Sequence, residues 1–131
     1  MVKRIIIIVV LFVSLIGLAT YEVVSVDNII TSLETMVETL QVDISENKNN
    51  VNEVTESVKK VQTFWNDHEE NLCLMFNHKD LSAITDTLTR LFSYVENNDY
   101  DNAIAEVNLL KKYSEKNRHI MGFNLQNLLQ K

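Results

Sequence analysis

The fold class is decided by residues 51–75, which read VNEVTESVKKVQTFWNDHEENLCLM. Large and mostly apolar side chains recur there at every third or fourth position: Val51, Val54, Val58, Val61, Trp65, His68, Leu72 and Met75. This spacing places them along one face of an α-helix, whereas a strand would alternate at every second residue. A regular heptad is typical of a face that packs against another helix. The stretch therefore predicts a long helix with a buried seam.

The segments on both sides keep the same rhythm. The seam before it contains Val26, Ile29, Ile30, Leu33, Met36, Val37 and Leu40. The next one contains Leu81, Ile84, Leu88, Leu91 and Val95, and a looser last one contains Ile104, Val107, Leu110, Ser114, Met121, Leu125 and Leu128. The 131 residues include no proline and two glycines, so the turn residues that an all-β chain needs are missing. We therefore predict an all-α protein.

The N-terminus carries an apolar run between charges of opposite sign. Lys3 and Arg4 precede uncharged residues from Ile5 to Tyr21, and Glu22 is the first charge after them. Seventeen helical residues rise about 25 Å, near the lower limit for crossing a hydrocarbon core of about 30 Å. Cations before the run and acids after it place the N-terminus in the cytoplasm. We predict a single-pass anchor over residues 1–21 and an extracytoplasmic domain over residues 22–131.

Two alternatives to an anchor fit the same pattern. A basic start, an apolar run and the small residues Gly17 and Ala19 are typical of a signal peptide cleaved after Ala19, which would give a secreted protein. The second alternative to an anchor is a buried core helix of a cytosolic protein. No helix-breaking residue follows Ala19, and this favours the uncleaved anchor.

Short polar segments separate the predicted helices. Asn50, with Glu53 three residues later, is typical of an N-cap with a reciprocal partner. Asn77 or Asp80 is expected to cap the third helix, and Asp99 the fourth, after a left-handed residue at Asn97 or Asn98. Short connections imply antiparallel neighbours. We therefore expect the anchor helix to continue into an antiparallel bundle of three to four helices with coiled-coil-like packing.

The predicted fourth helix, over about residues 100–129, is longer than the third, over about 81–95. Its end contains Phe123, Leu125, Leu128 and Leu129. In an antiparallel bundle this end overhangs and points back toward the bilayer. We expect it to pack on the second helix or to touch the membrane surface.

Charge and cysteine content exclude several classes of function. The net charge is −6, and removing Lys3 and Arg4 leaves −8 outside the membrane, which argues against a nucleic-acid partner. A domain of that charge is expected to stand off anionic headgroups. One cysteine makes no intramolecular disulfide and no structural zinc site.

The residues that could bind a metal ion or act as a nucleophile lack the partner residues that such a site needs. His68 has no second ligand at a helical spacing, and we expect it to be partly buried and hydrogen-bonded to a facing helix. Cys73 is five residues from both His68 and His78, so on one helix they lie on different faces and form no nucleophile pair. We expect Cys73 to be a packing residue, with an intermolecular disulfide as the alternative. The acidic cluster Asp67, Glu69 and Glu70 is expected to be a solvated face. No cofactor is expected.

Aromatic residues beside the seams mark a candidate surface for a protein partner. Trp65 is adjacent to Phe64, and Phe92 is two residues from Tyr94, so these pairs are divided between faces of their helices. The core needs one residue of each pair. We predict that the partner surface is drawn from Phe64, Phe92, Tyr94 and Phe123, with either Phe92 or Tyr94 taken by the core.

The chain as a whole resembles an uncharacterised family of short, N-terminally anchored, all-helical proteins from Gram-positive spore-forming bacteria, known as a domain of unknown function. The resemblance rests on the Ile-rich anchor, the helix around Trp65, the block Asn77–Ile84 with the Leu88, Arg90-Leu91 and Tyr94 that follow it, the Asn98-Asp99-Tyr100 turn and the Asn127-Leu128-Leu129 end. It implies the same architecture, and it implies partners among small multi-span membrane proteins.

The sequence favours a protein that is not an enzyme. We expect a membrane-anchored interaction or accessory subunit of the bacterial cell envelope, bound to lipid through its N-terminal helix and to a protein partner in the membrane or envelope. The seam over residues 26–40 either zips to a second copy or to a partner, or closes a four-helix bundle within one chain. The alternative function is a secreted or anchored bundle that holds a small apolar ligand or a cation between its helices.

Overall fold

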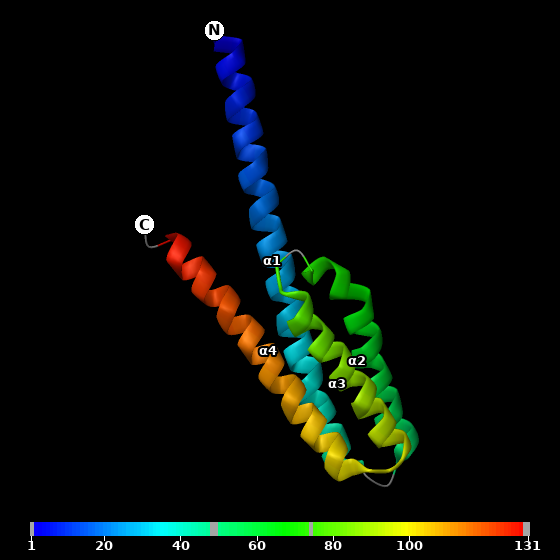
Figure 1. Cartoon of the computed structure of the whole chain (residues 1–131). Coiled ribbons are helices and arrows are strands. Elements are labelled where there is room, and N and C mark those ends of the chain that lie inside the picture. Colours follow the sequence, from blue (N-terminus) through cyan, green and yellow to red (C-terminus); the bar gives the residue numbers. More distant parts are fainter. Residues whose placement is uncertain (1, 48–49, 74, 130–131) are drawn as a thin grey trace.

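The computed structural model describes residues 2–47, 50–73 and 75–129, with side chains described as far as Lys116. These residues form four helices: α1 (Val2–Glu46), α2 (Val51–Leu72), α3 (His78–Glu96) and α4 (Tyr100–Leu129). They contain no strand. The all-α prediction is therefore confirmed, and Figure 1 shows the helices as one antiparallel bundle with the N-terminal half of α1 projecting from it.

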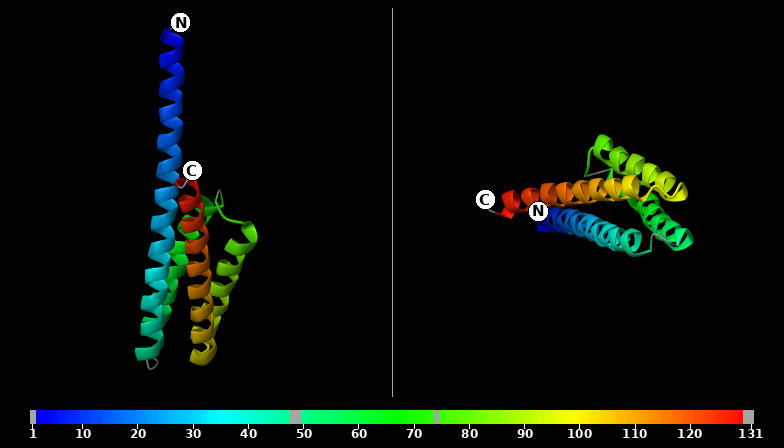
Figure 2. Two further views of the ribbon diagram at one scale, coloured as in Figure 1. Left: turned by 90° about the vertical axis from the view of Figure 1, so that its left-hand side faces the viewer. Right: turned by 90° about the horizontal axis from the view of Figure 1, so that it is seen from below.

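Each helix packs against two neighbours. α1 contacts α2 and α4, and α3 contacts the same two helices from the opposite side. The view from below in Figure 2 shows this four-sided arrangement. The α1 seam is thus covered by helices of its own chain, as expected if residues 26–40 close a four-helix bundle.

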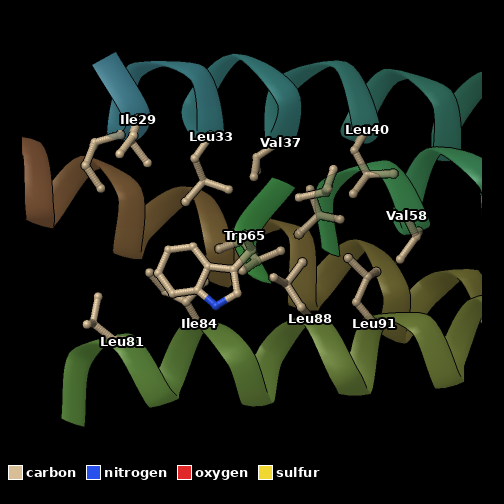
Figure 3. Packing of buried hydrophobic residues seen from close by; sticks show 14 of the residues in the cluster. Ile29, Leu33, Val37, Leu40, Val58, Trp65, Leu81, Ile84, Leu88 and Leu91 are labelled. Atoms are coloured by element: carbon tan, nitrogen blue, oxygen red, sulfur yellow. The ribbon is translucent and has the colours of Figure 1, made fainter. Parts of the chain in front are cut away.

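The predicted seams form the core. Every seam residue of α3 is buried, as are Val54, Val58, Val61, Trp65 and Leu72 of α2. Figure 3 shows Trp65 in the middle of this core, between Leu33 and Val37 of α1 and Ile84 and Leu88 of α3. Its side chain is 0% exposed. Trp65 is therefore the largest single apolar contribution to the bundle.

At two seam positions a neighbouring residue takes the buried place, because a helix ends or begins there. Met75 is 41% exposed and Phe76 takes the buried place, since α2 ends at Leu72 and the chain turns before α3. At the start of α4, Ala103 is buried and Ile104 only half-buried. Met121, Leu125 and Leu128 lie outside the described side chains.

At two of the three junctions a polar side chain caps the start of the following helix, as expected. The side chain of Asn77 accepts a hydrogen bond from the Lys79 amide at 3.0 Å, and that of Asp99 accepts one from the Asn102 amide at 3.3 Å. Asn98 has φ 59°, the left-handed residue that stops α3. Asn50 does not cap α2 with its side chain, because its amide donates instead to the Glu53 carboxylate at 3.0 Å.

Polar contacts fix how far α4 extends along α1. Lys111 forms an ion pair with Glu38 at 3.3 Å, and Gln41 donates to Asn108 at 3.1 Å. In both pairs the residue numbers sum to 149, so the same register places Leu129 at about the level of Thr20. Lys116 pairs with Asp80 in the first turn of α3 at 3.1 Å, so α4 continues past the start of α3. The predicted overhang of the α4 helix is confirmed.

α1 has two halves with different surroundings. Its apolar residues from Ile5 to Leu18 are each more than half exposed, whereas burial in the bundle begins at Val26. Among the described residues, α1 is the one helix long and apolar enough to cross a membrane, and its apolar window is not buried in the bundle. The interpretation of this run as a buried core helix is therefore wrong.

Candidate functional site

A shallow groove lies between α1 and α2 at the end of the bundle nearest the apolar run. One hollow of about 280 Å³ is lined by Tyr21, Glu22, Ser25, Val26, Asn71 and Met75. An adjoining hollow of about 320 Å³ is lined by Ser25, Asn28, Ile29, Ser32, Phe64, His68 and Asn71. Since both share Ser25 and Asn71, they form one depression, which we call the α1–α2 groove.

The backbone pattern explains why this groove exists. Ser25, Asn28 and Ser32 follow the same three–four spacing as the α1 seam and are positioned beside it. These small side chains leave the space between α1 and α2 partly unfilled at this end of the bundle. The sequence carried this signal as small polar residues flanking an apolar seam. The site candidates predicted from the sequence were aromatic or titratable residues, so these small polar residues were not among them.

An aromatic pair forms the wall of the groove on α2. The rings of Phe64 and His68 stack with centroids 4.4 Å apart, and both side chains are half-buried. Nδ1 of His68 lies 2.7 Å from the Phe64 carbonyl oxygen. A carbonyl can only accept, so Nδ1 carries the proton and donates. His68 is partly buried as expected, but the expected bond to a facing helix is wrong, because its partner belongs to its own helix.

We predict that His68→Leu leaves the fold intact and changes the free energy of unfolding by less than about 1 kcal/mol. The change removes one hydrogen bond, typically worth about 1 kcal/mol, and adds apolar contact with Phe64. The measurement is thermal unfolding of the full chain followed by circular dichroism, for wild type and variant, with and without a chelator. A wild-type midpoint that falls with chelator, together with a variant that does not respond, would contradict the structural role.

Behind this wall, a polar chain crosses from α2 to α3. The indole nitrogen of Trp65 donates to Oγ1 of Thr85 at 2.8 Å, and the Thr85 hydroxyl lies 3.1 Å from Oε1 of Glu69. A buried indole N–H needs such a partner. Glu69 is half-buried, so the acidic cluster is not solvated throughout, whereas Asp67 and Glu70 are exposed.

The α2–α3 turn brings together two residues that the sequence separated. Sγ of Cys73 lies 4.0 Å from Nδ1 of His78, and it also donates to the Glu69 carbonyl at 3.5 Å. The prediction that Cys73 and His78 lie apart is wrong, because α2 ends at Leu72 and the turn replaces the continuous helix that the prediction assumed. Cys73 packs against the core and is half-buried.

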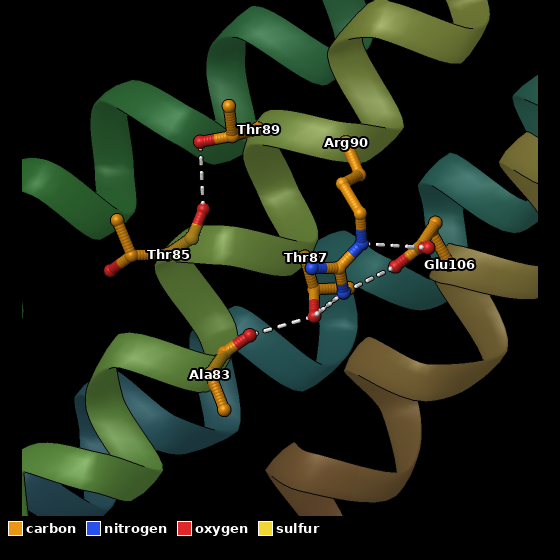
Figure 4. A network of polar contacts seen from close by, with 6 residues as sticks. All are labelled: Ala83, Thr85, Thr87, Thr89, Arg90 and Glu106. Atoms are coloured by element: carbon orange, nitrogen blue, oxygen red, sulfur yellow. Dashed lines mark hydrogen bonds and ion pairs between the residues drawn. The ribbon is translucent and has the colours of Figure 1, made fainter.

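A second polar network joins α3 to α4 (Figure 4). Arg90 donates from Nε and Nη2 to the two carboxylate oxygens of Glu106, at 2.9 and 3.0 Å. The hydrogen bond that Arg90 donates to Glu106 raises the pKa of Arg90 above its ordinary value. Arg90 also donates to Thr87, a fully buried hydroxyl that donates in turn to the Ala83 carbonyl. The fork geometry of this pair fixes the two helices relative to each other.

The other aromatic residues proposed for a partner surface lie away from the groove. Phe92 and Tyr94 are both half-buried and pack against the core. Nζ of Lys59 lies 5.7 Å from the centre of the Phe92 ring, a cation–π contact. Phe123 lies outside the described side chains. The structure thus places Phe64 in the groove and does not bring Phe92 or Tyr94 to it.

Few polar groups among the described residues are free to bind a metal ion or a ligand. No group of three or more His, Cys, Asp or Glu residues in that part of the chain is placed to hold a metal ion. The Tyr100 hydroxyl, at the far end of the bundle, is a buried polar atom without a hydrogen-bond partner. Tyr100 does not line any of the hollows described on the molecule.

Comparison with known proteins places most of the chain in one family. Residues 20–128 match the sequence profile of a family described as a domain of unknown function, DUF4363. Comparison with curated proteins gave no match, and comparison with solved structures gave none either. The match covers the whole bundle and begins at the end of the apolar run.

Proposed function

Since the chain belongs to the DUF4363 family, to which no function is assigned, we propose its role from the structure: a membrane-anchored interaction subunit of the bacterial cell envelope that is not an enzyme. Its partner docks in the α1–α2 groove. The observation that carries this proposal is the position of the groove, which begins at Tyr21 and Glu22, where the apolar run ends.

The anchor is supported by the exposure of the apolar run. Its side chains from Ile5 to Leu18 are 53–65% exposed, apart from the small residues, and water is an unfavourable surrounding for them. Lys3 and Arg4 before the run and Glu22 and Asp27 after it favour a bundle outside the cytoplasm. α1 continues through Ala19 without a break, which favours an uncleaved anchor over a cleaved signal peptide.

The lining of the groove supports an integral membrane protein as the partner. Ser25, Asn28, Ser32 and Asn71 offer hydrogen-bonding side chains, and Phe64 offers an apolar wall. Interfaces that combine an aromatic anchor with a polar rim are typical of specific association. A segment that leaves the bilayer beside α1 enters this groove directly, in agreement with the multi-span partners that the family resemblance implied.

The polar side chains that catalysis would use serve packing instead. Glu69 and Arg90 are hydrogen-bonded to a neighbouring helix, and His68 is hydrogen-bonded to the backbone of its own helix. The hollows described on the molecule lie at its surface, and the core between the helices is filled by side chains such as Trp65. We therefore place an interaction role ahead of the alternative, an apolar ligand or cation held inside the bundle. A source in spore-forming Gram-positive bacteria remains a prediction.

Photocrosslinking in native membranes tests this proposal. A benzoylphenylalanine at Phe64 is expected to crosslink to a membrane protein, because Phe64 lines the groove. The same substitution at Phe92 is the matched control, since Phe92 is also a half-buried aromatic residue but lies outside the groove. Crosslinks from Phe92 alone would move the partner to another face. Crosslinks to a second copy of the chain would replace the partner by self-association, and no crosslink from either position would contradict the proposal.

A further inference from the structure

The bundle begins very close to the predicted edge of the membrane. Tyr21 ends the apolar run, and Val26, five residues later, is the first buried residue of the bundle. Five helical residues rise about 7.5 Å. The headgroup layer on each side of a bilayer is about 5–7 Å thick, the difference between a core of about 30 Å and a whole of 40–45 Å. No spacer separates the bundle from the lipid.

The α2–α3 turn is the part of the bundle that reaches this level. Met75 and Asn71 line the same hollow as Tyr21 and Glu22, so the turn lies beside the residues where α1 leaves the bilayer. Figures 1 and 2 show the turn at the end of the bundle nearest the apolar half of α1. Met75 is 41% exposed there although its neighbour Phe76 is buried, and the exposed Lys79 follows in the first turn of α3.

The end of α4 arrives at the same level and brings positive charge. The register with α1 brings Leu129 to about the level of Thr20, and Figure 1 shows the C-terminal end of α4 at this level but splayed away from α1. Residues 111–131 contain five Lys or Arg and one Glu, whereas the remainder of the domain is strongly acidic. The charge of the domain is therefore divided unevenly along the sequence, with a basic last segment and an acidic remainder.

We propose that the α2–α3 turn rests in the headgroup layer of the bilayer that α1 crosses, with Met75 as its apolar contact. An exposed apolar side chain flanked by a cation suits this layer, where acyl chains and phosphates meet. The contact holds the bundle upright, because α1 alone would let it tilt freely. It also keeps the mouth of the α1–α2 groove at the membrane surface. This inference rests on the membrane anchor of the proposed function.

Fluorescence in lipid nanodiscs tests the contact with the full chain. A Cys73→Ser background carries one new cysteine, labelled with nitrobenzoxadiazole: Met75→Cys at the turn, or Val42→Cys as the control. Val42 is also an exposed apolar residue, at 51%, and lies twenty-one residues beyond Tyr21 on α1. The nanodiscs contain phosphatidylcholine and phosphatidylglycerol, with a portion of lipid that bears a nitroxide on its headgroup. Quenching at residue 75 is expected to be several times stronger than at residue 42.

The outcomes separate this inference from the anchor. A label on Val13→Cys reports whether the apolar run lies in lipid. Blue-shifted emission at residue 13 without quenching at residue 75 would overturn the headgroup contact alone, and a water-exposed label at residue 13 would overturn the anchor as well. A blue-shifted emission at residue 75 without lipid quenching would assign Met75 to a protein interface and overturn the proposal. Asn71→Cys repeats the measurement if Met75→Cys lowers the helical content.

Discussion

Trp65→Ala is expected to lower the free energy of unfolding by about 3–5 kcal/mol, the usual cost of removing a large aromatic side chain from a core. Trp65 is 0% exposed and lies between α1 and α3, so its loss leaves a cavity that rigid helices cannot close. The Thr85 hydroxyl also loses the indole donor. We expect the thermal midpoint to fall by about 10 °C or more.

The measurement is thermal unfolding of the full chain in nanodiscs, followed by circular dichroism. Phe64→Ala is the matched control, because Phe64 is the adjacent aromatic residue but is only half-buried. We expect it to cost clearly less, since less of its surface leaves water on folding. Equal losses for the two variants would show that Trp65 has no central place in the core.

Val13→Arg is expected to abolish stable insertion of α1 in the membrane. Val13 lies at the centre of the run from Ile5 to Tyr21 and is 62% exposed. An arginine at the centre of a spanning helix costs about 2.5–3.5 kcal/mol, which lowers the inserted fraction on the order of a hundredfold. The run is barely long enough to span, so no neighbouring apolar turn compensates.

Fractionation of cells that express tagged protein measures this effect. Val42→Arg is the control, because it places the same charge on an exposed apolar position of α1 within the bundle. We expect wild type and Val42→Arg in the membrane fraction, with a C-terminal tag digested by protease added to wall-stripped cells. A Val13→Arg variant that fractionates like wild type would contradict the anchor. A mature wild-type N-terminus at Thr20 would show signal cleavage instead.

Some features of the site depend on one helix alone, and others depend on how two helices pack together. Phe64, half-buried beside the seam residue Trp65, could be predicted, because the faces of one helix follow from residue spacing. The small residues Ser25 and Ser32 beside the α1 seam are visible in the sequence, but the groove arises because they face α2, and that pairing depends on how the two helices pack. The same reason explains Glu69, whose partner Thr85 belongs to another helix.

Turns show the same division on a shorter scale. The helices, their seams and the caps at Asn77 and Asp99 could be predicted from the sequence, since they depend on spacing and on bonds between near neighbours. That Phe76 replaces Met75 in the core and that Cys73 meets His78 depends on the folded chain, because the end of α2 bends it and interrupts the helical spacing. The fold also decides that the α1 seam packs within its own chain. Periodicity shows that a face will be buried, and the helices available within reach decide what buries it.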